Sequence, residues 1–561
     1  MKKFFGLVLL AFLFWNSGEV FGGQGKAQDA EDPYGEQLGT VVFPVSCNGP
    51  AAAHAKRGLA LMHHMTYEGA RKSFKAAVES DPDCAMGYWG QAMSFIHPLW
   101  SDPPEEDEFQ QGQALLEKAR EQGRTTAWEQ AYIEAAQSYY DQGMDTSEED
   151  NLSAFEEGWQ RVHEQFPDDP EAAVFYALAH LSTADPDDKS YVHQKRAAAI
   201  AREVMKQVPD HPGAHHYTIH AYDYPPLAEK ALDVSRSYAR IAPEVPHAMH
   251  MPSHIFTRLG LWQESIAMNR QSAEAALQHP AGNMISLHYP HALDYLAYAY
   301  LQRAEDAKAK GVLERLRAIE EPVQPHGTSA YTLAAVPARY FLERQEWAEA
   351  AALQPRKPAE YPWDDFPAME AITHFAKAYG AARIKDEQSA RQALDALTAL
   401  RKEAAKSSAY WAKQVDIQKQ AAEAWLVYEQ GDPKQGLEMM RRAADLEATT
   451  EKHPITPGEI LPASELLADM LLDEGQYQEA EKAYRTALER SPNRFNSLYG
   501  AGRAAELAGH KDDAALFYSK LVNVTADDAT RERLSHARKY LETGAQAHDE
   551  QDVHGRNGLK R

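Results

Sequence analysis

Residues 461–494, LPASELLADMLLDEGQYQEAEKAYRTALERSPNR, contain two helical segments within 34 positions. Small residues at places 8 and 20 let the two helices approach closely, an aromatic residue at place 24 fills the space between them, and a proline at place 32 ends the second helix. A third small residue stands at place 27. These places hold Ala468, Ala480, Tyr484, Ala487 and Pro492. The segment therefore predicts a helical hairpin.

The same frame recurs near the other end of the chain and again directly after residue 494. A frame from residue 51 holds Ala70, Phe74, Ala77 and Pro82, and the frame from residue 495 keeps Gly502, Ala514 and Tyr518. This period and these residues resemble the tetratricopeptide repeat family. The resemblance implies an all-α, tetratricopeptide-type α-solenoid, a right-handed superhelix of helical hairpins whose concave groove is suited to a protein or peptide ligand.

The centre of the chain keeps the register with two interruptions. Frames begin at residues 212 and 246, and an insertion, PAGNMISLHY (280–289), shifts the next frame to residue 290. Weaker frames start at residues 331 and 417, and a second insertion, EKHPITPGE (451–459), precedes the C-terminal pair of repeats. Helices are expected at 153–166 and 171–183, but residues 101–210 give no clear register. We therefore expect the solenoid to span residues 47–542, with a histidine-rich centre at 211–300.

The ends of the chain lack the repeat. Lys2 and Lys3 precede the apolar run FFGLVLLAFLFW, which predicts a signal peptide over residues 1–22 and a periplasmic or secreted protein with no membrane span after cleavage. The alternative is an uncleaved N-terminal anchor, although the run is short for a membrane helix. Residues 23–46 are expected to be a leader or linker, and residues 543–561, which have no apolar periodicity, a mobile tail.

Composition narrows the class of protein further. The 561 residues are 44% hydrophobic, enough for a large core, and the formal net charge of −25 makes nucleic acid an unfavourable partner. Only two cysteines are present, Cys47 and Cys84. In an exported chain they are expected to form a disulfide, which would contribute roughly 4 kcal/mol in the chain-entropy model. The alternative is two separate buried thiols.

Histidines follow the repeat in the centre of the chain. His216 and His220 lie four residues apart, and His250 and His254 repeat them 34 residues later. The segment HYPHALDY (288–295) adds a histidine and an aspartate from the next repeat. At about 100° per residue, the frame places 2, 5, 9, 12 and 13 lie within one arc of a helix, and in tetratricopeptide repeats those places face the groove. The residues at places 2 to 12 are His216, His220, Asp223, His247, His250, His254, His291 and Asp294.

We interpret this cluster as a site for one or two metal ions. Two imidazoles at i and i+4 can bind one ion, and neighbouring helices are close enough for rings from both to meet it. The two i, i+4 pairs are expected to be ligands, while His247, His291 and the two aspartates complete or orient the set. Nitrogen and carboxylate ligands without thiolate favour Zn²⁺, Fe²⁺, Mn²⁺ or Cu²⁺. The alternative is a hydrogen-bonded ladder of histidines across the groove, or a site for an acidic peptide.

Three functions remain open from the sequence. The ion or ions are stored and presented to a partner, or they support metal-assisted hydrolysis in which Asp223 or Asp294 accepts a proton from bound water. The alternative is a peptide-binding scaffold without chemistry, and the third possibility, a metal-dependent redox enzyme, has no distinguishing motif. The sequence contains no GxSxG, Walker or CxxC motif. The runs HPGAHHYTIHAYDYPPLAEKAL and PHAMHMPSHIFTRLGLWQES resemble a bacterial exported branch of tetratricopeptide proteins.

Overall fold

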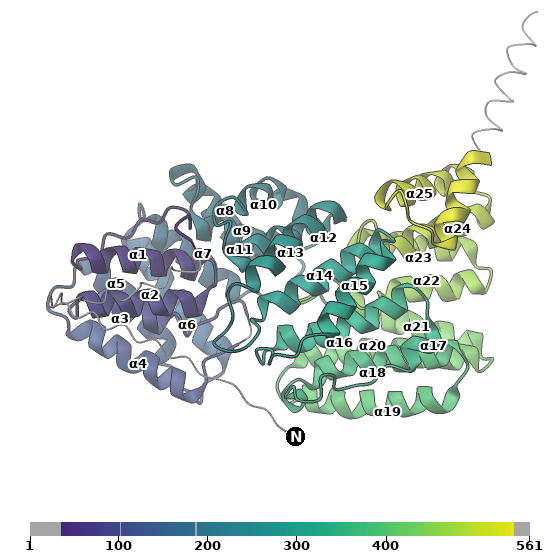
Figure 1. Cartoon of the computed structure of the whole chain (residues 1–561), viewed down its shortest axis with the longest axis horizontal. Helices are drawn as coiled ribbons and strands as arrows, with labels where there is room; N and C mark the ends of the chain where they lie inside the picture. Colours follow the sequence, from purple (N-terminus) through teal and green to yellow (C-terminus); the bar gives the residue numbers. More distant parts are fainter. Residues whose placement is uncertain (1–34, 101, 186–187, 544–561) are drawn as a thin grey trace, which may run out of the picture. The chain divides into compact units, whose positions relative to one another are not determined.

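A computed structural model describes residues 35–100, 102–185 and 188–543. The predicted signal peptide and all but the first residue of the predicted tail lie outside this part of the chain. The described residues belong to one compact unit, and they contain the α-helices α1–α25, a further helix over residues 532–543, two short 3-10 helices and no β-strand beyond isolated bridges (Figure 1). The prediction of an all-α fold is confirmed. In the described part, no helix has the length and apolar character that crossing a membrane requires.

The helices run in order along the chain. The first group is α1 (Gly49–His63), α2 (Tyr67–Ser80), α3 (Ala85–Met93), α4 (Glu106–Glu121), α5 (Ala127–Tyr140), α6 (Glu148–Gln165), α7 (Pro170–Ser182) and α8 (Val192–Gln207). The central group is α9 (Pro212–Tyr222), η1 (Ala228–Ala231), α10 (Leu232–Tyr238), α11 (Pro246–His250), α12 (Pro252–Arg258), α13 (Trp262–Ala276), α14 (His288–Gln302), α15 (Asp306–Arg317), α16 (Gly327–Glu343) and α17 (Trp347–Ala351). The last group is η2 (Trp363–Asp365), α18 (Pro367–Arg383), α19 (Glu387–Ala404), α20 (Ala409–Glu429), α21 (Pro433–Ala448), α22 (Ala463–Asp473), α23 (Tyr477–Arg490), α24 (Phe495–Ala508), α25 (Lys511–Val524) and a helix over residues 532–543.

Each helix packs mainly against the next helix or the next but one, as expected of a solenoid (Figure 1). The aromatic residue at place 24 explains how closely the hairpins stack. A Cβ atom added to Gly500 would lie 2.2 Å from the ring of Tyr484, and one added to Gly90 would lie 2.2 Å from the ring of Phe74. In both repeats the ring therefore lies directly on the backbone of the helix that begins the following hairpin.

Residues 35–46 of the predicted leader are built into the fold. Phe43 is 1% exposed and packs between Trp89 and Trp128, with ring centroids 5.7 and 5.6 Å away. The backbone N–H of Val42 donates to Oε1 of Glu171 at 2.7 Å. The buried ring of Phe43 and this backbone hydrogen bond thus hold the segment against the N-terminal helices.

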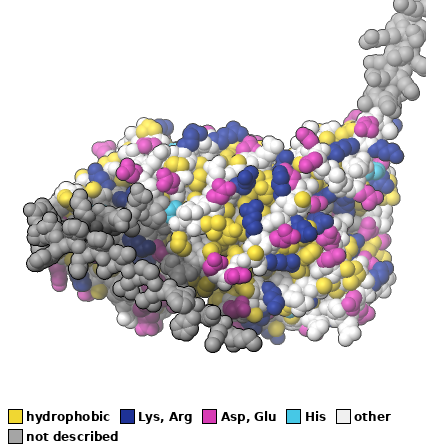
Figure 2. All heavy atoms as spheres, viewed as in Figure 1, with side chains coloured by type: hydrophobic (Ala, Val, Ile, Leu, Met, Phe, Trp, Pro, Cys, Tyr) yellow, Lys and Arg dark blue, Asp and Glu magenta, His cyan; other side chains and the backbone are white. Residues whose placement is uncertain are grey.

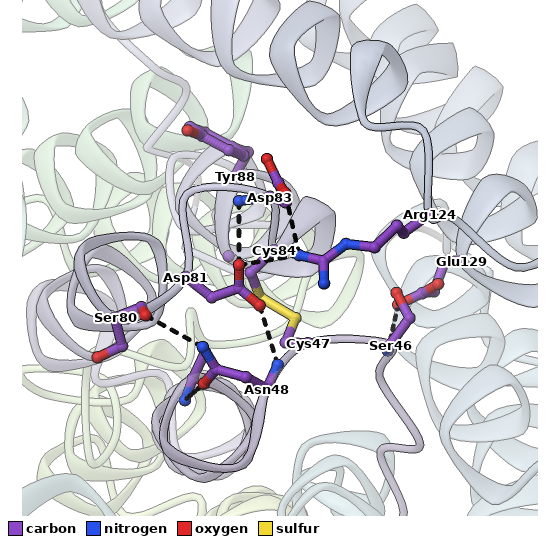
Figure 3. Close-up of a disulfide and its surroundings, with 12 residues drawn as sticks. Ser46, Cys47, Asn48, Ser80, Asp81, Asp83, Cys84, Tyr88, Arg124 and Glu129 are labelled. Atoms are coloured by element: carbon purple, nitrogen blue, oxygen red, sulfur yellow. Dashed lines mark hydrogen bonds and ion pairs between the residues drawn. A yellow bond between two sulfur atoms is a disulfide. The ribbon is translucent and has the colours of Figure 1, made fainter.

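A disulfide fastens the end of this segment to the second hairpin. Cys47 and Cys84 are joined by an S–S bond of 2.02 Å, with Cα atoms 4.9 Å apart (Figure 3). Beside the bond, Asp81 accepts from the backbone N–H of Asn48 and from the guanidinium of Arg124, both at 2.9 Å (Figure 3). The chain before α1 is therefore tied covalently and by hydrogen bonds to the start of α3.

The second insertion folds back over the centre of the chain. The hydroxyl of Tyr295 donates to the carbonyl of Thr456 at 3.2 Å, and the guanidinium of Arg339 donates to the carbonyl of Gly458 at 2.7 Å. The ammonium of Lys452 reaches Asp223. Residues 449–462 thus join the C-terminal repeats to the centre of the chain through contacts across 119 to 229 positions of sequence.

Candidate metal centre

Two successive repeats place the predicted histidines at equivalent positions of their first helices, α9 and α11. Proline occupies the first position of both α9 and α11, Pro212 and Pro246, where its missing N–H costs nothing and its fixed φ favours the helix. His216 and His220 lie on α9. In the next repeat Pro252 divides the helix, so His250 ends α11 and His254 belongs to α12.

The histidines form two separate groups of three. The first triad consists of His216, His220 and His247, and the second triad consists of His250, His254 and His291; within each triad one nitrogen from every ring lies within 4.8 Å of the others. Each triad combines an i, i+4 pair with one histidine from the following repeat. All six side chains are buried, and on the face shown in Figure 2 few histidine atoms reach the surface.

The spacing within each i, i+4 pair fits a shared ion. The Nε2 atoms of His216 and His220 lie 3.1 Å apart, and those of His250 and His254 lie 3.0 Å apart. Two imidazole nitrogens bound to one transition metal at about 2.0–2.1 Å are separated by about 3.0–3.4 Å. The third histidine is close in both cases, with ring centroids 5.0 Å from His216 to His247 and 4.1 Å from His250 to His291.

Hydrogen bonds fix the tautomers of the second triad. Nδ1 of His250 lies 2.7 Å from Oδ1 of Asn269, whose amide nitrogen is already committed to the carbonyl of Ser265 at 2.8 Å. Nδ1 of His254 lies 2.9 Å from a carboxylate oxygen of Asp223. Both partners only accept, so each ring carries its proton on Nδ1 and the two Nε2 lone pairs point at one another across 3.0 Å. This arrangement suits a cation between the rings.

The rings of the first triad have fewer hydrogen bonds to the surrounding protein than those of the second triad. Nδ1 of His216 donates to the carbonyl of His63 at 2.7 Å, which leaves its Nε2 free to accept. Among the described residues, neither ring nitrogen of His247 has a hydrogen-bond partner, although the side chain is only 6% exposed. Buried polar atoms without partners are rare and indicate a missing ligand, ion or water.

Burial keeps the six rings neutral. It lowers the pKa of His216, His247, His250 and His291 well below the usual 6.5, and the neighbouring histidines lower it further. Burial also lowers the pKa of His220 to about 3. It outweighs the opposing effect of Asp223 on the pKa of His254, which is lowered as well. Neutral imidazole is the form that binds metal.

The two predicted aspartates lie outside both triads. Asp223 accepts from His254, from Nε of Arg258 at 2.8 Å and from Nζ of Lys452 at 3.0 Å. Burial would raise the pKa of its carboxyl, but Lys452, Arg258 and His254 together hold that pKa well below its usual range. Asp223 therefore orients His254 as an anion.

Asp294 faces a different partner. One of its oxygens lies 3.4 Å from Nε of Arg339, and burial raises the pKa of its carboxyl to about 6 against the effect of that arginine. Like Arg339, it is fully buried. Asp294 thus pairs with a cation on α16 rather than with a histidine triad.

A small cavity borders both triads. It has a volume of about 30 Å³ and is bordered by two histidines of each triad, His220 and His247 on one side and His254 and His291 on the other. The rest of its wall consists of Leu99, Trp100, Leu287, His326, Thr328, Pro454 and Ile455. Because a bound water needs about 10–15 Å³ by this measure, the cavity has room for one or two small ligands.

Several residues around the triads escaped the sequence analysis. Lys452 and the cavity residues 454 and 455 come from the second insertion, which the sequence marks only as an interruption of the repeat. Nothing in the sequence distinguishes Asn269 and Arg258 from other helix residues. Their roles appear only in the structure, where Asn269 contacts His250 and Arg258 contacts Asp223. A histidine that binds metal through Nε2 usually needs an acceptor for Nδ1, so the sequence predicts that such partners exist. It does not predict which residues they are.

A third buried group contains His63, Glu171 and His211. Nε2 of His63 lies 2.8 Å and Nε2 of His211 lies 3.2 Å from the carboxylate of Glu171, which also accepts from Val42. Burial would raise the pKa of the Glu171 carboxyl, but the two histidines hold that pKa far below its usual range. This group is a hydrogen-bonded anchor for residues 35–46, and the carbonyl of His63 also orients His216.

Comparison with known proteins identifies the repeat. Residues 466–530 match the family model described as tetratricopeptide repeat. No curated protein matches. Solved structures that are similar include a human IFIT1 dimer with PPP-AAAA, at 12% identity over 85% of this chain and 91% of that chain (TM-score 0.34), and yeast Tom70, at 11% identity over 89% and 96% (TM-score 0.31). Residues 466–530 are thus identified as tetratricopeptide repeat, and the described residues form an all-α solenoid of that type.

Proposed function

We propose that this tetratricopeptide repeat protein binds two transition-metal ions, one in each histidine triad. The observation that carries the proposal is the pair of Nε2 lone pairs of His250 and His254, which face one another at 3.0 Å while both Nδ1 atoms are committed to acceptors. Three imidazoles per ion leave a position open for a further ligand, as in catalytic rather than purely structural metal sites. The sequence-based set of Zn²⁺, Fe²⁺, Mn²⁺ and Cu²⁺ applies to both triads.

The outer partners support the same proposal. In protein metal sites the second nitrogen of a ligating histidine donates to a carbonyl or carboxylate, which fixes the ring. His216 uses the carbonyl of His63, His250 uses Asn269, and His254 uses Asp223. Three of the six rings are therefore already oriented with Nε2 directed into their triad.

Metal analysis of the purified protein tests the proposal. We expect close to two equivalents of transition metal per chain after dialysis, and loss of both when His216 and His250 are changed together to Ala. His536→Ala is the matched control, because it removes a half-buried histidine that pairs with Glu506 and belongs to none of the groups able to hold an ion among the described residues, and it should leave the metal content unchanged. Wild-type protein that retains no metal after incubation with each of the four ions would refute the proposal.

Hydrolysis is not favoured by the positions of the aspartates. A general base must be free to take a proton from the bound water. Asp223 already accepts from His254, Arg258 and Lys452, and Asp294 pairs with Arg339 and belongs to neither triad. We therefore propose a metal-binding protein in which neither carboxylate serves as the base.

Export is part of the proposal. The basic and apolar N-terminus predicts a signal peptide, and the disulfide between Cys47 and Cys84 is the bond expected in an oxidising compartment. Fractionation of cells that express the full chain should recover a shortened protein outside the cytoplasm. Retention of the full-length chain in the cytoplasm would contradict this assignment.

Binding of a protein or peptide is a second candidate function, since the tetratricopeptide repeat is a protein-interaction fold. The cavity that borders the triads is too small for a peptide. A larger groove of about 930 Å³ lies beside α15 and α16, next to the short helix α17 of five residues. Its wall includes Leu313, Leu316, Pro337, Phe341 and Trp363. A peptide library screened against wild-type protein and Phe341→Glu should yield ligands that only the wild type binds, whereas ligands shared by both would exclude this groove.

A further inference from the structure

The two triads are neighbours as well as copies. His247 of the first triad and His250 of the second lie one helical turn apart on α11, with ring centroids separated by 6.4 Å. His220 and His254 approach to 6.0 Å from the other side. Both triads border the same cavity of about 30 Å³. Two ions held in this way share the space between them.

We propose that the two triads form one dinuclear copper centre that binds dioxygen in the cavity that both triads border. This inference rests on the metal binding proposed above and adds the identity of the ions, their coupling and the class of ligand.

The donor atoms favour copper. Each triad offers three imidazole nitrogens, and in the described part of the chain neither contains a carboxylate or a thiolate. Manganese and ferrous iron are usually held with oxygen ligands, and a pair of such ions is commonly bridged by carboxylates, which Asp223 and Asp294 do not provide here. Among divalent ions, nitrogen sites bind copper most tightly.

The charges around the second triad favour a low-charge ion and an anionic ligand. Asp223 is the carboxylate that contacts a triad histidine, and it is matched by two buried cations, Arg258 and Lys452. Two divalent ions would place four more positive charges in this buried region, whereas two Cu⁺ ions would place two. Because buried charge without a partner is costly, the oxidised pair requires a negative ligand between the ions.

The cavity restricts that ligand to a very small molecule. About 30 Å³ accommodates one or two water-sized groups. Leu99, Trp100, Leu287 and Ile455 line it on the sides that the histidines leave open, which suits an apolar diatomic molecule better than a hydrated anion. Dioxygen fits this size and lining, and the reduced copper pair supplies what it needs to become an anion.

The binding step balances without another reactant. Each Cu⁺ gives one electron, so two Cu⁺ become two Cu²⁺, and dioxygen takes both electrons and becomes peroxide bound to the two ions. No proton is taken up, and the O–O single bond is retained. Dissociation returns both electrons to copper and releases dioxygen.

The test uses the purified full chain, freed of metal, loaded with two equivalents of Cu⁺ under anaerobic conditions and then exposed to dioxygen. We expect two coppers and one dioxygen bound per chain, a near-ultraviolet charge-transfer band from peroxide, and no paramagnetic signal until denaturation releases Cu²⁺. Signals of two isolated Cu²⁺ ions, no uptake of dioxygen, or preference for Zn²⁺ in an equal mixture would overturn the inference. Two retained metals with any of these results leave the proposed metal binding intact, whereas a protein that holds no metal loses both.

His247→Leu tests the coupling, because it removes a ligand from the first triad without breaking a hydrogen bond between described residues. The variant should keep one copper in the second triad, lose dioxygen uptake, and show the signal of an isolated Cu²⁺ ion in air. His220→Asn serves the same purpose if His247→Leu does not fold, and His536→Ala should behave as the wild type. Dioxygen uptake by a variant with one copper would refute a shared site.

Discussion

His247 and His250 are both buried on α11, but they differ in their hydrogen bonds. We therefore expect their substitution to change the free energy of unfolding in opposite directions. Neither ring nitrogen of His247 has a hydrogen-bond partner among the described residues, whereas Nδ1 of His250 is bonded to Asn269 at 2.7 Å. A buried polar group without a partner costs about 1–3 kcal/mol, and removing one member of a buried pair costs a similar amount because the other member is stranded. In chelator, His247→Leu should therefore raise the free energy of unfolding by about 1–3 kcal/mol, and His250→Leu should lower it by about as much.

Metal reverses the benefit of the first substitution. An ion present at a free concentration 100-fold above its dissociation constant stabilises the native protein by about 2.7 kcal/mol per site, and either variant loses this for its own triad. Urea unfolding of both variants and the wild type, in chelator and in excess metal, measures the change in unfolding free energy without metal and the loss of metal stabilisation for each variant. If His247→Leu destabilises the metal-free protein as much as His250→Leu does, then the ring nitrogens of His247 have a hydrogen-bond partner in the native protein. That result would refute the prediction.

Three further predictions follow from the contacts around the triads. Asp223→Asn should weaken metal binding about 10–100-fold, measured by titration against a competing chelator, because His254 loses the carboxylate that orients it. Reduction of the bond between Cys47 and Cys84, 37 residues apart in sequence, should lower the free energy of unfolding by about 4 kcal/mol in the chain-entropy model, and a matched double Ser variant should do the same. The metal-free protein should lose stability as pH falls below about 6.5. The pKa of His220, for example, is about 3 in the native state, so the unfolded state binds the extra proton in this window, which costs up to about 1.4 kcal/mol per pH unit for each such histidine. A flat profile between pH 6.5 and 4 would contradict buried neutral rings.

The repeat could be predicted where packing itself is periodic. Tyr484 and Phe74 each lie against a glycine sixteen residues later, so the frame records a real contact and identifies the hairpins at both ends of the chain. The register of residues 101–210 could not be set, and this region forms long helices such as α6, with 18 residues. Residues 35–46 and 449–462 are held by contacts with distant helices, such as Val42 with Glu171 and Lys452 with Asp223. Such partners have no period and leave no signal in the sequence.

The candidate site was predicted as a set but not as two groups. Frame places 5 and 9 predicted that the members of each pair are neighbours, and the structure places His216 and His220 together on α9, and His250 and His254 together across the boundary of α11 and α12. The pattern did not show that His247, one turn before His250, belongs with the preceding pair instead. That assignment depends on how α11 is set against α9. The aspartates were equally ambiguous, because a carboxylate near a histidine can ligate or orient, and the nearby cations Arg258 and Arg339 determine which role is open to it.

The second triad also argues against the alternative of a histidine ladder. A ladder of neutral imidazoles requires one Nε2–H for every Nε2 lone pair, but His250 and His254 have both placed their protons on Nδ1. Moving either proton would leave Asn269 or Asp223 without its donor. An extra proton between the rings is opposed by burial, which lowers the pKa of both histidines, and by Lys452 and Arg258 beside them. A metal ion meets the same repulsion, yet coordination by several protein ligands is worth about 10–16 kcal/mol for structural zinc, far more than the one or two kcal/mol of a hydrogen bond. These energies favour the ion that we propose over a proton between the two nitrogens.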